Sequence, residues 1–183
     1  MSELEKLSRQ GLIDLYYGDE SRVSIEPCVP YGWQFADEDV FMPSSQGAGL
    51  NCFALLSRAN ELVFETTRQT ITSDFIVEQM EQLSFSIKKV TVVVLDNARV
   101  HTAEKVSARR GYWQKRGLMI FYLPPHSPHL NIAETLWRKL KYEWLQATDY
   151  LTTEGLFYKV RQALAAVGKG LKIQFSEFSL GPA

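Results

Sequence analysis

Hydrophobic positions along the chain fall into short runs and alternating stretches, which together predict an α/β domain. The run from Val90 to Val94, broken only by Thr91, is rich in β-branched residues and predicts a central strand buried on both faces. Leu12 to Tyr17 instead alternates apolar with polar positions, which is typical of a half-buried strand. Three further runs predict strands, the first two of them joined as a hairpin: Leu50–Ser57, Leu62–Thr67 and Leu118–Leu123.

Apolar residues at helical spacing predict four helices between and after these strands. The first is capped by Thr72 or Ser73 and carries Ile76, Met80 and Leu83 on one face. The other three are expected at Thr102–Arg116, Asn131–Leu145 and Thr152–Val167. An antiparallel meander followed by β-α-β crossovers predicts one mixed sheet with helices on its faces.

Length and composition are those of an ordinary globular protein with 45% hydrophobic residues. We expect a single domain over residues 1–183, with an insert loop at about 27–49 and a tail at 169–183. No apolar run approaches the roughly 20 residues that a membrane-spanning helix needs, and the charged N-terminus lacks the apolar core of a signal peptide. Cys28 and Cys52 are isolated, which favours free thiols in a reducing cytoplasm.

The net charge of −1 hides an asymmetry between the two halves of the chain. Residues 1–96 carry 7 Lys and Arg against 15 Asp and Glu, a net charge of −8, whereas residues 97–183 carry 13 against 6, a net charge of +7. A basic half favours a polyanionic partner such as nucleic acid. Basic helix faces are also common on proteins that bind no polyanion, so the charge alone decides little.

Three carboxylates stand near the ends of predicted elements. Asp96 directly follows the central strand, where an ionised group needs either a positive partner or a helix N-terminus to cap. Asp19 continues the apolar face of the first strand, whereas Glu20 falls on the opposite face. Glu134 opens a predicted helix three residues after Asn131, which is also the spacing of a capping box. Each acid alone has a structural explanation, but Asp19, Asp96 and Glu134 together can surround two divalent cations.

Three ordered blocks resemble those of the mariner-type DDE transposases, with the bacterial insertion-sequence branch the nearest match. They are Gly18–Ser21, Leu95–His101 and Leu123–Trp137, within a resemblance that runs from about residue 12 to 165. The resemblance implies a ribonuclease-H-like, retroviral-integrase-type fold with a mixed five-stranded sheet. It also implies that Asp19, Asp96 and Glu134 are the catalytic acids and the ligands of two Mg²⁺ or Mn²⁺ ions.

The same resemblance implies DNA as the partner, both transposon ends and target, and a homodimer without membrane association. Candidate DNA contacts are Asn97, His101, Lys105, Arg109, Arg138 and Lys141. His101 is equally well explained as a helix-start residue satisfied by its neighbours. Relatives carry an N-terminal helix-turn-helix region, whereas only about ten residues precede the first predicted strand here. We therefore expect that region to be absent, and end recognition to come from a separately encoded subunit or to be lost.

The resulting expectation is a DDE transposase catalytic domain in the bacterial cytoplasm, associated with the nucleoid. It would cleave DNA phosphodiesters at transposon ends with Mg²⁺ and join the 3′-hydroxyl to target DNA. One alternative is a ribonuclease-H-like nuclease or resolvase that cuts without strand transfer. Another is an inactive truncated transposase that only binds DNA or dimerises.

Overall fold

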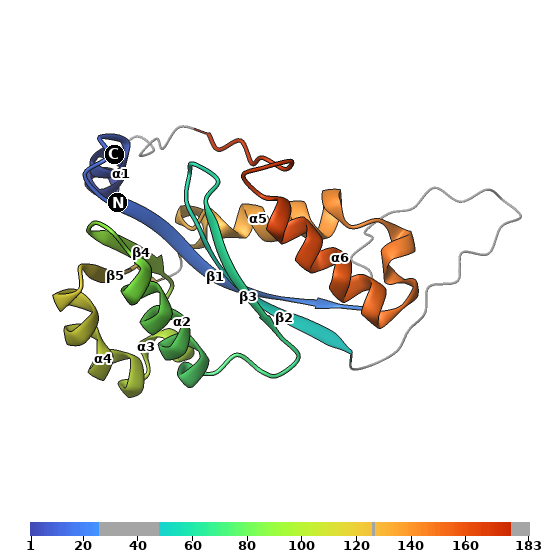
Figure 1. The fold of residues 1–183 in the computed structure, drawn as a ribbon, viewed down its shortest axis with the longest axis horizontal. Coiled ribbons are helices and arrows are strands. Elements are labelled where there is room, and N and C mark those ends of the chain that lie inside the picture. The colour runs from blue at the N-terminus through green and yellow to red at the C-terminus, as the bar shows by residue number, and fades with distance from the viewer. Residues whose placement is uncertain (26–47, 126, 177–183) are drawn as a thin grey trace, which may run out of the picture.

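The computed structural model describes residues 1–25, 48–125 and 127–176, and in this part of the chain five strands form one sheet (Figure 1). The strand order is β3-β2-β1-β4-β5. The strands are β1 (Asp14–Ser24), β2 (Gly49–Leu56), β3 (Leu62–Thr67), β4 (Thr91–Leu95) and β5 (Leu118–Tyr122). The first three are antiparallel neighbours, and β4 and β5 run parallel to β1. The predicted α/β fold with a mixed five-stranded sheet is confirmed.

Helices cover both faces of this sheet (Figure 1). They are α1 (Ser2–Arg9), α2 (Ser73–Ser86), α3 (Arg99–Thr102), α4 (Glu104–Lys115), α5 (Ala133–Lys139) and α6 (Thr153–Ala166). A π-helical turn, η2 (Leu140–Trp144), continues α5, and two short 3-10 helices, η1 (Pro128–Leu130) and η3 (Ala147–Leu151), flank this segment. One hydrophobic core packs β1, β2 and β4 against α5 and α6, and a second packs the opposite face against α2 and α4.

The central strand β4 shows why the sequence folds around it. Val92 and Val94 belong to the core under α5 and α6, whereas Val93 and Leu95 belong to the core under α2 and α4. All five residues of β4 are buried. A strand that lies between two cores needs apolar side chains on both faces, which is the pattern that predicted it.

The predicted hairpin, α2 and α6 also agree with the structure. Thr72 caps α2, its hydroxyl oxygen accepting the Phe75 N–H at 3.4 Å, and Thr152 caps α6 in the same way through Gly155 at 3.1 Å. These caps satisfy backbone donors that a helix start leaves free. Such features depend on neighbouring residues only, and the sequence is enough to predict them.

Several boundaries differ from the prediction. The first strand extends to Ser24, so Asp19 lies within it and not at its end. The helix expected at Thr102–Arg116 is α4, which begins two residues later, at Glu104. A separate short helix, α3, precedes it and was not predicted, and the backbone is extended at Ala103 between the two (φ −56°, ψ 150°). The N-terminal helix α1 was not predicted, although Leu4 and Leu7 pack against the core under α5 and α6.

Part of the predicted organisation lies outside the described residues. This holds for most of the insert loop at 27–49, for Cys28, and for the last seven residues of the tail. Cys52 is a free, buried thiol. In the described ranges, no helix is long and apolar enough to cross a membrane.

Candidate active site

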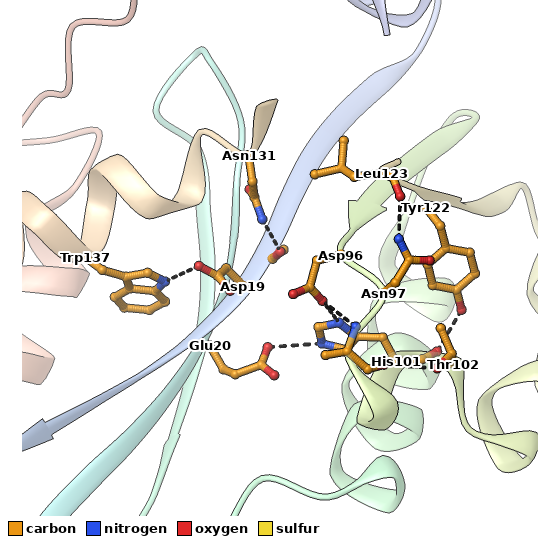
Figure 2. Close-up of polar contacts among 12 residues, drawn as sticks. Asp19, Glu20, Asp96, Asn97, His101, Thr102, Tyr122, Leu123, Asn131 and Trp137 are labelled. Carbon is orange, nitrogen blue, oxygen red and sulfur yellow. Dashed lines mark hydrogen bonds and ion pairs between the residues drawn. The ribbon is translucent and has the colours of Figure 1, made fainter. Parts of the chain in front are cut away.

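Strand β1 presents two acids on opposite faces of the sheet. Asp19 faces α5, where its Oδ2 accepts a hydrogen bond of 3.1 Å from the indole N–H of Trp137. Glu20 faces the other side, where its Oε2 lies 3.0 Å from Nε2 of His101 (Figure 2). The strand parity read from the sequence therefore separates these neighbours correctly.

Asn131 ties the start of α5 to β1. Its side-chain amide donates to the carbonyl oxygen of Gly18 at 3.0 Å, and its Oδ1 accepts the N–H of Ala133 at 3.1 Å. A Cβ at Gly18 would lie 2.5 Å from a methyl group of Leu95, so a larger residue at this strand position would force that side chain to move. The contact brings the helix that carries Glu134 against the strand that carries Asp19.

The segment after β4 is fixed by side-chain hydrogen bonds. Asp96 Oδ1 accepts the N–H of Ala98 at 3.0 Å and lies 2.7 Å from Nδ1 of His101. The side-chain amide of Asn97 donates to the carbonyl oxygen of Leu123, just after β5. The Tyr122 hydroxyl donates to the carbonyl oxygen of His101 at 2.7 Å. Asp96 therefore both restrains the turn before α3 and remains next to the other acids.

The three predicted acids line one cavity of about 210 Å³. They come from β1, from the end of β4 and from the first turn of α5. The full lining is Asp19, Asp96, Asn97, Leu123, Pro124, Pro125, Ser127, Asn131 and Glu134. Glu20 does not belong to this lining.

Electrostatic conditions differ sharply between the acids. Burial, followed by the charge of Glu20, raises the pKa of Asp19 to about 7, and the charges of Asp96 and Glu134 act in the same direction. The hydrogen bond from His101 is the main cause that lowers the pKa of Asp96. Neither Asp19 nor Glu134 forms an ion pair with a described residue. Within the described part of the chain, no cation therefore balances these two acids.

His101 is completely buried between two carboxylates. Burial by itself lowers the pKa of the imidazole, but the hydrogen bond to Asp96 and the close contact with Glu20 outweigh it and raise the pKa to about 9. The side chain offers no exposed surface for a DNA contact. The sequence allowed His101 to contact DNA or to be satisfied by neighbouring residues, and its buried position favours the second explanation.

The chemistry of the cavity fits a hard divalent cation, since three carboxylates line it and burial together with neighbouring acids raises the pKa of Asp19. In the described ranges, no three His, Cys, Asp or Glu side chains converge closely enough to hold an ion in this conformation. Mg²⁺ keeps several waters and takes only one or two carboxylates. Glu134 is exposed, and exposed side chains change rotamer readily.

The remaining predicted DNA contacts divide into two groups. Arg138 and Lys141 line a second cavity of about 410 Å³, to which Glu134, Thr135, Trp137 and Tyr142 also contribute. Lys105 and Arg109 lie on α4 and pair with acids of α2, at 2.8 Å from Asp74 and 2.9 Å from Glu81. Only the first group lies beside the three acids.

Sequence reasoning missed the contact between Trp137 and Asp19, which lie far apart in the sequence. The side chain is buried, but its N–H needs an acceptor there, and Asp19 provides it. Its position one turn after Glu134 was the available signal. The pairing of Glu20 with His101 was missed as well.

A mixed five-stranded sheet between helices, with acids on β1, after β4 and on α5, defines a ribonuclease-H-like domain. The sequence profile of the family described as DDE superfamily endonuclease matches residues 14–156, and the chain belongs to this family. The predicted membership of the DDE superfamily is confirmed. A comparison with curated protein sequences finds no significant match.

Solved structures share the fold at low sequence identity. Mos1 transposase, in a paired-end complex with the left transposon end, is 15% identical with a TM-score of 0.52, over 92% of this chain and 60% of the Mos1 chain. The catalytic core domain of BIV integrase is 14% identical with a TM-score of 0.53, over 86% of this chain and 85% of that domain. A chain of the simian T-cell lymphotropic virus intasome is 10% identical with a TM-score of 0.57, over 85% and 49%. This chain thus spans less than two thirds of the Mos1 transposase.

Proposed function

We propose that this chain is the catalytic domain of a DDE transposase, which cleaves DNA phosphodiesters at transposon ends and joins the resulting 3′-hydroxyl to target DNA. The observation that carries the proposal is the cavity lined by Asp19, Asp96 and Glu134 in a chain of the DDE endonuclease family. These acids come from three distant parts of the sequence, and stabilising the fold does not explain why all three line one cavity.

Asp19, Asp96 and Glu134 would hold two Mg²⁺ or Mn²⁺ ions. When bound, such ions supply an activated water or hydroxyl and stabilise the leaving oxygen of a phosphodiester. The chain itself positions the oxygen ligands: Trp137 holds Oδ2 of Asp19, and His101 holds Oδ1 of Asp96. The pyrrolidine rings of Pro124 and Pro125 stiffen the opposite wall of the cavity.

The DNA backbone would pass over α5, beside the acids. Arg138 and Lys141 follow Glu134 by about one and two helical turns, and neither pairs with a described acid. Tyr142 in the same cavity is 55% exposed. Unpaired cations next to an exposed aromatic ring suit phosphates and an unstacked base. This supports Arg138 and Lys141 as DNA contacts over Lys105 and Arg109.

The test is metal-dependent nicking of supercoiled plasmid DNA by Asp19→Asn, Asp96→Asn and Glu134→Gln. Each substitution removes a charged ligand while keeping the side-chain shape, and we expect a loss of more than about 100-fold. DNA binding in EDTA should persist. Glu78→Gln, an exposed acid on α2, is the matched control and should nick normally. Nicking retained by all three variants would refute the assignment.

A nuclease or resolvase that cuts without joining is the second candidate, because the matched family description names endonuclease activity alone. A duplex with a pre-exposed 3′-hydroxyl separates the two. Joining of this strand to plasmid DNA supports the transposase, whereas nicking without joining supports the nuclease.

Partner chains belong to the same proposal. We infer a homodimer on DNA, and a separately encoded helix-turn-helix subunit as the source of end recognition. Light scattering with and without a DNA duplex tests the first. Selective binding to one duplex sequence by this chain alone would contradict the second.

A further inference from the structure

His101 lies between two carboxylates that come from different parts of the fold (Figure 2). Its Nδ1 is 2.7 Å from Asp96 Oδ1, after β4, and its Nε2 is 3.0 Å from Glu20 Oε2, on β1. The imidazole has no exposed surface, and the Tyr122 hydroxyl holds the backbone carbonyl oxygen of the same residue. We call Glu20, His101 and Asp96 the histidine bridge.

The bridge restrains one oxygen of Asp96 and leaves the other unrestrained. Oδ1 accepts from both Ala98 N–H and His101 Nδ1, whereas Oδ2 has no hydrogen bond to a described residue. The side chain of Asp96 is 52% exposed, so without these contacts it would sample several rotamers. Two donors on one oxygen fix the plane of the carboxylate and leave Oδ2 for the cavity.

Glu20 completes the restraint from the opposite side of the ring. It does not line the cavity, and its side chain is 28% exposed. A ring bonded at one nitrogen only can tilt about that bond, whereas a ring held at both nitrogens cannot. Space-filling alone does not explain this arrangement, because an apolar side chain would fill the position without burying two polar atoms.

We propose that Glu20 and His101 are positioning residues for Asp96, acting together to hold its free oxygen in the orientation that a divalent cation requires. This inference rests on the proposed function, because it assumes that Asp96 is a ligand. Residues that orient metal ligands commonly affect affinity or activity by about 10- to 100-fold. Glu20, which follows Asp19 in the sequence, thus helps to orient Asp96.

Two substitutions at His101 separate positioning from space-filling. The amide nitrogen of Asn in His101→Asn lies near the place of Nδ1 and keeps a donor for Asp96. The amide nitrogen of Gln in His101→Gln lies near the place of Nε2 and keeps only the Glu20 contact. We expect the Gln variant to lose about 10- to 100-fold in Mn²⁺ affinity and in kcat for plasmid nicking. The Asn variant should lose distinctly less, and KM for DNA should change in neither.

Glu20→Ala tests the bridge without disturbing a buried residue. We expect Mn²⁺ affinity, measured by calorimetry on the DNA-free protein, to fall about 10-fold, with an equal fall in kcat. Glu20→Gln keeps an acceptor for the imidazole and should lose less. Glu65→Ala, an exposed acid on β3, is the control and should bind Mn²⁺ normally. Thermal unfolding of the metal-free variants reports stability separately.

The outcomes distinguish this inference from the proposed function. Unchanged Mn²⁺ affinity and kcat in Glu20→Ala, or a Gln variant of His101 as active as the Asn variant, would overturn the bridge while leaving the acids in their roles. If the His101 variants do not fold, the Glu20 pair decides alone. A wild-type chain that neither binds Mn²⁺ nor nicks DNA would overturn both.

Discussion

Asp19 and Glu81 are two carboxylates that each accept a hydrogen bond from a tryptophan indole, yet their surroundings are opposite. Trp137 donates to Asp19 at 3.1 Å, and Trp113 donates to Glu81 at 2.8 Å. Glu81 is also contacted by Arg116 at 2.6 Å and by Arg109 at 2.9 Å. No described cation reaches Asp19; its nearest charges are other acids.

The pKa values follow from this difference. Hydrogen bonds from Arg116, Arg109 and Trp113, in that order, lower the pKa of Glu81 to about 2. Burial and the charge of Glu20 raise the pKa of Asp19 to about 7. Glu81 joins α2 to α4 and contributes to stability, whereas the charge on Asp19 opposes folding unless a cation binds. Asp19, which no described cation balances, thus lies in the candidate cavity, whereas Glu81 lies outside it.

The largest expected difference is between Asp19→Asn and the wild type. Nicking should fall by more than about 100-fold, because a ligand charge is lost. Stability of the metal-free protein should rise by about 0.5–2 kcal/mol, since removing an unbalanced buried charge relieves repulsion among the acids. Urea unfolding measures this gain. A lower free energy of unfolding would show that the carboxylate of Asp19 is neutralised within the fold.

The two tryptophans provide a matched pair. Trp137→Phe keeps the ring but removes the donor to Asp19, and we expect kcat to fall about 10-fold as that ligand loses its orientation. Trp113→Phe removes the corresponding donor to Glu81 and should destabilise the protein by about 1 kcal/mol while the folded enzyme nicks normally. Plasmid nicking and thermal unfolding are measured on both. Equal effects on kcat would erase the distinction between the two regions.

How far the sequence predicts this molecule depends on whether a feature is local. The buried strand β4 was predicted, as was a cap at Thr72 or Ser73, of which the structure uses Thr72. The cap at Thr152 is equally local but was not predicted. The three acids were found by strand parity and by resemblance. The contact between Trp137 and Asp19 joins residues 118 positions apart, and no local pattern indicates it.

The break between α3 and α4 has the same kind of cause. The sequence predicted one helix from Thr102, whereas α4 begins at Glu104 and the short helix α3 precedes it. In the structure α3 places His101 against Asp96 and Glu20. The contact with Glu20 is a tertiary one, which local periodicity does not indicate. Tertiary contacts override propensity most readily where an element is short.

At the α2–α4 contact, Glu81→Gln should reduce stability by about 1–2 kcal/mol, because two arginines and an indole lose a charged acceptor. The folded variant should keep its nicking rate, since Glu81 does not line the cavity. Urea unfolding and plasmid nicking check the two halves of this prediction. A slower nicking rate, measured where Glu81→Gln is fully folded, would show that the α2–α4 contact affects the candidate active site.

The pH dependence of the same contact has a defined sign. The pKa of Glu81 is about 2 when folded and near its ordinary value of 4.5 when unfolded, so its contribution is fully present above pH 4.5. That contribution is lost as the pH falls from 4.5 toward 2. The stability difference between the wild type and Glu81→Gln should therefore shrink over this interval, as measured by urea unfolding at each pH. If the stability difference stays constant between pH 4.5 and 2, the charge of Glu81 is not the source of the stabilisation.

The smallest expected effect separates paired from unpaired cations. Lys105 and Asp74 form an exposed pair, with 63% and 70% of their side chains accessible, and such pairs contribute little. Arg138 pairs with no described acid and lines a cavity together with Glu134. Arg138→Ala should weaken DNA binding about fivefold and reduce the slope of log affinity against log salt by about 1, whereas Lys105→Ala should leave both nearly unchanged. Fluorescence anisotropy at several salt concentrations measures both. Equal slopes for the two variants would mean that DNA follows the α4 surface as well, and that ion pairing with α2 does not withdraw Lys105 from phosphates.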